Sequence, residues 1–190
     1  PFPKSLESLW FYKCKLPQPL DVANLECLRK LEIRGSTAVL VKEDVISSLS
    51  SLEELHVSHG FVHSYDKYHM EPLVKEICKL TRLTSLQFAF YQDNTFQGTD
   101  LFFHLDKYNL FVGEVLHGYT RVDQDWEVPL TRSIKLKGNS KPWEGLMARA
   151  DEVGLSYSDI QVSSICHGHE RAFQDLKRLR INQCHSMEHI

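Results

Sequence analysis

The stretch Leu6-x-x-Leu9-x-Phe11-x-x-Cys14-x-Leu16 places two leucines three residues apart and a third apolar residue two positions further on. Clear copies of this spacing are Leu28-x-x-Leu31-x-Ile33, Leu52-x-x-Leu55-x-Val57, Leu83-x-x-Leu86-x-Phe88 and Leu176-x-x-Leu179-x-Ile181-x-x-Cys184. Weaker copies are Leu105-x-x-Tyr108-x-Leu110, Thr131-x-x-Ile134-x-Leu136 and Ala150-x-x-Val153-x-Leu155. The copies recur on average about every 24 residues, a period that indicates a solenoid of stacked units.

Each copy contains two apolar residues separated by one other residue, which is the side-chain period of a β-strand. The signature and its period are those of leucine-rich repeats. We therefore expect an α/β leucine-rich repeat solenoid, or horseshoe, with a parallel concave β-sheet and irregular convex connections. About eight repeats would fill residues 1–190 as one domain. Leu31, Leu55, Leu86 and Leu179 are expected in the core.

The residues between the strands also follow the repeat. The position after each strand normally holds a small or hydrogen-bonding side chain, which points inward and forms hydrogen bonds with backbone groups at the turn. Here that position reads Cys14, Ser36, Gly60, Tyr91, Gly113, Asn139, Ser158 and Cys184. One-turn helices or 3₁₀ turns are expected at 20–25 and 45–49, a helix at 73–77 after Pro72, and an inserted loop at 60–70.

The composition of the 190 residues is that of an ordinary globular protein, with 42% hydrophobic and 25% charged residues. No apolar run is long enough to span a bilayer, so no membrane span is expected. The net charge of −3 argues against a nucleic-acid partner, which would favour a basic excess. The five cysteines are odd in number and widely separated, and no signal peptide precedes them, so reduced thiols and a cytoplasmic location are expected.

The chain resembles the repeat region of plant intracellular immune receptors, the coiled-coil, nucleotide-binding, leucine-rich repeat disease resistance proteins. The ending Cys184-x-x-Met187-Glu188-x-Ile190 is similar to a recurrent phrase of that family, and residues 105–113 look like its irregular middle repeat. The opening residues 5–14 resemble it as well. The resemblance implies an array for plant defense and innate immunity that senses a pathogen effector or a modified host protein. It also implies autoinhibitory contact with a nucleotide-binding module in the full-length receptor.

No motif in the chain itself indicates an enzyme or a cofactor site. It has no G-x-x-x-x-G-K-[ST] phosphate loop, so no ATP or ADP binding is expected, and no G-x-S-x-G elbow. Asp123, Asp125 and Glu127 lie close enough in the sequence to act as paired catalytic carboxylates, but a charged surface loop explains them equally well. The segment Cys166-His167-Gly168-His169 lacks the paired-cysteine spacing of a zinc site, so no metal is expected.

The residues that alternate with the core leucines should form the open concave face and bind a protein partner. One row is Trp10, Glu32, His56, Gln87, Asn109, Lys135, Gly154 and Arg180, and the next is Tyr12, Arg34, Ser58, Ala89, Phe111, Lys137, Ser156 and Asn182. Aromatic residues and arginine are enriched at interface hot spots. The predicted partner-binding residues are Trp10, Tyr12, Arg34, Phe111, Lys135, Lys137 and Arg180. The insertion around Phe61, Tyr65 and Tyr68 is a rival site.

A second function stays open, that of a free-standing leucine-rich repeat adaptor, such as a substrate-recognition subunit of a ubiquitin ligase. The sequence upstream of Pro1 would separate the two, because we expect this chain to be a fragment of a longer receptor. Expressed alone, such a fragment should associate, since each terminal repeat would expose an apolar edge.

Overall fold

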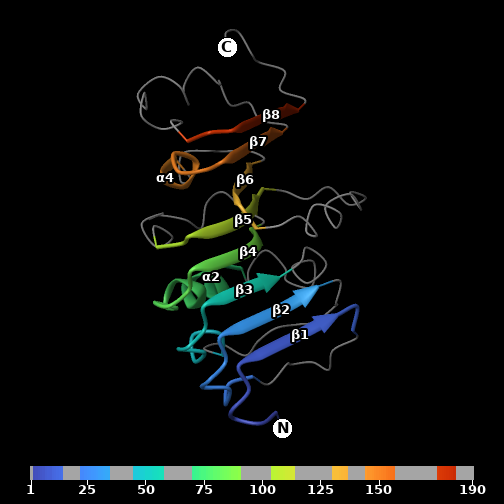
Figure 1. The fold of residues 1–190 in the computed structure, drawn as a ribbon, viewed down its shortest axis with the longest axis vertical. Coiled ribbons are helices and arrows are strands. Elements are labelled where there is room, and N and C mark those ends of the chain that lie inside the picture. The colour runs from blue at the N-terminus through green and yellow to red at the C-terminus, as the bar shows by residue number, and fades with distance from the viewer. Residues whose placement is uncertain are drawn as a thin grey trace. The chain divides into compact units, whose positions relative to one another are not determined.

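A computed structural model describes residues 2–14, 22–34, 45–57, 70–90, 104–113, 130–136, 144–156 and 175–182. Each strand that is drawn as an arrow in Figure 1 falls on one of the predicted copies. The strands are β1 (Ser8–Tyr12), β2 (Lys30–Arg34), β3 (Glu54–Val57), β4 (Ser85–Phe90), β5 (Lys107–Val112), β6 (Arg132–Leu136), β7 (Glu152–Ser156) and β8 (Arg178–Asn182). The helices in the described ranges are α2 (Met70–Cys78) and α4 (Glu144–Met147).

The strands are parallel, and their order in the sheet follows their order in the chain. This arrangement confirms the parallel-stranded solenoid that the repeat predicts. The chain forms two compact units, the first with β1, β2, β3 and most of β4, and the second with β5 to β8. Little helix accompanies the strands in the described ranges.

In the first unit, the predicted register is confirmed. Leu9 pairs with Leu31, Leu31 with Leu55, and Leu55 with Leu86. The equivalent leucines thus stack in one row, and all four are buried. A parallel register of this kind follows from the pattern, because only one alignment puts every leucine on the core side.

In the second unit, the register of β5 differs from the prediction. Leu110, not Tyr108, pairs with Ile134, so the expected equivalence of Tyr108 and Ile134 is wrong by two residues. Side chains alternate along a strand, so a shift of two leaves each one on its original face. Tyr108 and Leu110 are therefore both fully buried, and the Tyr108 hydroxyl donates a 2.7 Å hydrogen bond to the Leu146 carbonyl.

The last strand of the second unit departs from the core prediction. Val153 pairs with Leu179 and Leu155 with Ile181, as the repeat predicts. Leu179 is nevertheless 49% exposed, so its assignment to the core is wrong. Among the described residues β8 pairs with β7 alone; β1 likewise pairs with one strand, yet Leu9 is buried, so one-sided pairing does not by itself account for the exposure of Leu179.

The connections contain the expected single turns and helix. Hydrogen bonds from Leu25 N to Val22 O and from Leu49 N to Ile46 O close one-turn segments. The helix predicted at 73–77 is confirmed as α2, with Pro72 in the first turn, where backbone N–H groups have no partner within the helix. The insertion predicted at 60–70 lies outside the described residues, apart from Met70.

The positions that follow the strands are only partly as expected. The Cys14 side chain is exposed rather than inward, although its thiol still donates to the Tyr12 carbonyl over 3.3 Å. Gly113 is buried with a φ of 126°, a backbone conformation that favours glycine. Ser36, Gly60, Tyr91, Asn139, Ser158 and Cys184 lie outside the described residues.

Candidate protein-binding surface

The outward side of β1 carries two large exposed aromatic rings. Trp10 is 66% and Tyr12 60% exposed, while Leu9 on the opposite side is buried. The ammonium group of Lys30 lies 5.4 Å from the Trp10 ring centroid, and that of Lys13 lies 5.0 Å from the Tyr12 ring. Both distances suit cation–π attraction, which restrains each ring from one side. The structure thus places these two predicted binding residues together on one strand.

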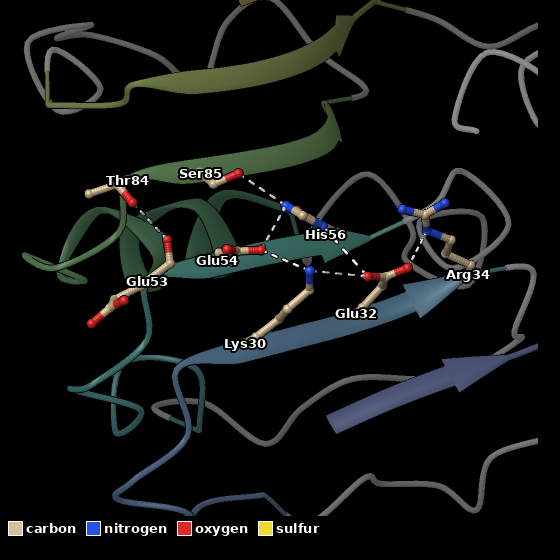
Figure 2. A network of polar contacts seen from close by, with 8 residues as sticks. All are labelled: Lys30, Glu32, Arg34, Glu53, Glu54, His56, Thr84 and Ser85. Carbon is tan, nitrogen blue, oxygen red and sulfur yellow. Dashed lines mark hydrogen bonds and ion pairs between the residues drawn. The ribbon is translucent and has the colours of Figure 1, made fainter. Parts of the chain in front are cut away.

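Toward β3 and β4, the outward face carries a polar cluster around the buried His56, which consists of Lys30, Glu32, Arg34, Glu54, His56 and Ser85. Figure 2 shows its members side by side on adjacent strands. His56 is only 3% exposed, and Gln87 is buried as well, so the expectation that the whole row faces solvent is wrong at these two positions. Because burial of this kind depends on the tertiary environment, alternation along a strand does not reveal it.

The imidazole of His56 is the centre of this polar cluster. Its Nε2 lies 3.1 Å from the Ser85 hydroxyl, its Nδ1 lies 3.7 Å from Glu32, and its Nε2 lies 3.9 Å from Glu54. Burial lowers the pKa of His56 below its usual range, as does nearby Lys30, while the two carboxylates oppose this shift. The ring is therefore neutral at pH 7. Since Ser85 is buried as well, the histidine–serine contact braces β3 against β4.

The charged members of the cluster neutralise one another. Lys30 lies 2.9 Å from Glu54 and 3.8 Å from Glu32, and Glu32 also forms an ion pair with Arg34. Arg34, a predicted binding residue, is half-buried and committed to this contact. Just before β2 and β3, the Arg29 guanidinium donates two hydrogen bonds of 3.1 and 2.8 Å to the Glu53 carboxylate. Ion pairs between side chains of adjacent strands stabilise a sheet, so stabilisation of the fold is sufficient to explain this group.

In the second unit, the two-residue shift brings Phe111 directly beside Lys135. The row across β5 to β8 is Phe111, Lys135, Gly154 and Arg180. A Cβ added at Gly154 would lie 3.2 Å from the Lys135 Cγ, so the missing side chain lets the stem of Lys135 lie against β7. Three predicted binding residues therefore share one row. The fourth in this unit, Lys137, lies outside the described residues.

Two arginines of β8 share a single carboxylate of β7. Arg178 Nε lies 2.8 Å from Glu152 Oε2, and Arg180 Nε lies 3.1 Å from Glu152 Oε1. The Glu152 side chain is 10% exposed, whereas those of Arg178 and Arg180 are 49% and 63% exposed. The sequence analysis identified Arg180 but missed Glu152, whose position directly opposite Arg178 in the predicted register is the signal that could have found it.

A second ionic group lies at the start of β6 and β8. Asp151 accepts from Arg132 at 3.0 and 3.2 Å and pairs with Lys177 at 2.8 Å. These hydrogen bonds hold the pKa of Asp151 well below its usual range. Arg132 also lies 4.0 Å from Asp175, so this group contains two cations and two anions.

The described residues contain no group of three or more histidine, cysteine or acidic side chains that could hold a metal ion. The candidate zinc segment and the acidic group at 123–127 lie outside them. Within the same ranges, no helix has the length and apolar character needed to cross a membrane. No protein-family model matches the chain, and no curated protein matches it.

Proposed function

We propose that the chain is a protein-recognition array that binds its partner through the outward face of the sheet. The exposed pair Trp10 and Tyr12 carries this proposal. Aromatic side chains bury a large area at a small cost in conformational entropy, and they dominate many interface hot spots. A strand that needed only to be soluble would not place two such rings in solvent.

The backbone beneath these rings is fixed before a partner arrives. Leu9 and Phe11 alternate with the rings and point to the opposite side, where Phe11 meets Phe2 with ring centroids 6.4 Å apart. Five residues of β1 pair in register with β2. Recognition groups on a rigid element lose little freedom on binding, which favours affinity.

The narrower proposal is that these strands are leucine-rich repeats of a plant disease resistance protein. The repeat signature and the parallel solenoid support it, as does the resemblance of residues 184–190 and 105–113 to that receptor family. The partner would be a pathogen effector or a host protein, and the full-length receptor's nucleotide-binding module would be a second, autoinhibitory one. Such a receptor acts in the cytoplasm without enzymatic activity of its repeats.

The alternative is an adaptor that selects substrates for a ubiquitin ligase, because the same exposed rings would suit that task. The full-length transcript separates the two functions. A nucleotide-binding module upstream of Pro1 supports the immune receptor, and an F-box-like helical motif supports the adaptor.

Binding through the aromatic pair is tested by comparing three forms of the chain as baits in leaf extract. The double variant Trp10→Ala, Tyr12→Ala should lose at least about tenfold of the partner that the unaltered chain retains. Glu26→Ala, an exposed change in the turn before β2, should retain it. The retained protein is then purified and its affinity for all three forms is measured by calorimetry. Equal affinity for the double variant and the unaltered chain would refute the proposal.

A further inference from the structure

We propose that the exposed side of β7 and β8, formed by Arg178, Arg180 and Glu152, binds an extended acidic segment of a protein partner with carboxylates at alternate positions. This inference specifies the partner chemistry within the proposed recognition function. It rests on the second unit alone, whereas the aromatic pair belongs to the first.

The charges at this surface do not balance. Among the residues that the structure describes, two guanidinium groups share the one carboxylate of Glu152, which leaves a positive excess. The neighbouring group around Asp151 is balanced, since Asp151 and Asp175 face Arg132 and Lys177. Ion pairs that serve only to stabilise a sheet need no such excess. A complementary anion from outside is therefore the group that would complete the site.

Both arginines are accessible and have hydrogen-bond donors beyond those that contact Glu152. Each arginine contacts Glu152 through its Nε, and about half or more of each side chain remains exposed. A guanidinium has five N–H donors in a planar fork that matches a carboxylate. Among the described residues, Glu152 is the ionic partner of both arginines, so their remaining donors are accessible to a ligand.

The two arginines have the same spacing as alternate side chains of an extended peptide. Arg178 and Arg180 are alternate residues of one strand, so they lie on the same face about 6.7 Å apart. An extended peptide has the same repeat, so acidic residues at positions i and i+2 would meet both arginines at once. Consecutive acidic residues point to opposite sides of an extended chain, so only half of them could contact the arginines.

Competition is the fourth element of the proposal. Glu152 occupies the arginines in the unbound protein, so an incoming carboxylate must draw them away from it. Replacing Glu152 by glutamine removes this competitor and should tighten binding, whereas a merely structural ion pair would give no such gain. This opposite effect of neighbouring substitutions separates a binding site from a structural contact.

The test measures fluorescence anisotropy of a short labelled peptide in which glutamate alternates with serine. The Arg178→Gln, Arg180→Gln variant should lose about tenfold or more in affinity, and Glu152→Gln should gain about threefold. The matched control Lys177→Gln removes one exposed positive charge from the same strand region and should change affinity by less than about twofold. Circular dichroism confirms that every variant is folded.

Other probes decide the specificity. A peptide with glutamine in place of glutamate should not bind, and one with its glutamates in consecutive pairs should bind more weakly. The proposal is overturned if the arginine variant binds like the unaltered chain, or if Glu152→Gln weakens binding. Tighter binding of a single-stranded oligonucleotide than of the peptide would indicate a nucleic-acid site and would also overturn it. Trp10→Ala, Tyr12→Ala should not affect the peptide, so the two proposals fail independently.

Discussion

Replacing Tyr108 by phenylalanine removes one hydroxyl from the core of the second unit and changes little else. The hydroxyl donates a 2.7 Å hydrogen bond to the carbonyl of Leu146 in α4, and both residues are fully buried. The substitution removes that bond, while the Leu146 carbonyl keeps the hydrogen bond that it accepts from the Arg149 backbone N–H over 3.2 Å. The loss of one buried hydrogen bond should destabilise the protein by about 1 kcal/mol. For a chain of this length, that corresponds to a fall of roughly 2–4 °C in melting temperature.

Urea unfolding followed by circular dichroism measures this change. Tyr12→Phe is the matched control, because it removes the same hydroxyl from a ring that is 60% exposed. The control should stay within about 0.5 kcal/mol of the unaltered chain. If both variants have the same stability, the Tyr108 hydrogen bond does not stabilise the contact between α4 and β5.

Burial also determines how other positions respond to substitution, alkylation and pH. Leu55→Asp should destabilise the fold by several kcal/mol in urea unfolding, because it buries an unpaired charge, whereas Leu179→Asp should cost markedly less at its 49% exposed position; equal losses would contradict the core assignment. Burial raises the pKa of Cys78 to about 11, so iodoacetamide should alkylate exposed Cys27 well before Cys78 at pH 8, as mass spectrometry would show. The lowered pKa of His56 stabilises the fold above the unfolded-state pKa near 6.5, and this contribution is lost as the pH falls through the folded-state value; His56→Gln should therefore flatten the stability profile between about pH 7 and 5, and an unchanged slope would refute it.

The repeat predicted the strands because its strongest copies share one alignment. Leu9, Leu31, Leu55 and Leu86 pair across β1 to β4 as expected, since any one-residue slip would turn every leucine to solvent. A shift of two residues in the register, in contrast, leaves every side chain on the same face, so the pattern does not exclude it. At β5, Tyr108 and Leu110 both satisfy the core side, so the sequence alone does not choose between them. In the structure the Tyr108 hydroxyl bonds to α4, a contact with a residue 38 positions away that the repeat pattern does not contain.

The candidate surface was predictable only where exposure follows from alternation. Trp10 and Tyr12 are exposed as expected, yet His56 and Gln87 are buried although they hold the same place in the repeat. Period two gives the side of the sheet on which a residue lies, but not what covers that side. The cation–π contact between Lys30 and Trp10 is likewise a cross-strand effect that no single copy contains.

Charge balance distinguishes the polar groups that fold the sheet from those that meet a partner. Around His56, Lys30 and Arg34 face Glu32 and Glu54, so the charges cancel and the ring at the centre is buried. Among the described residues the four charges of this cluster sum to zero, so a substitution at Lys30 should act first on stability. At β8, the arginines outnumber their carboxylate and stay exposed, so a substitution at Arg180 should act first on binding. Recognition should therefore depend on the exposed strands β1 and β8, while the polar cluster between β2 and β4 keeps the first unit rigid beneath its aromatic pair.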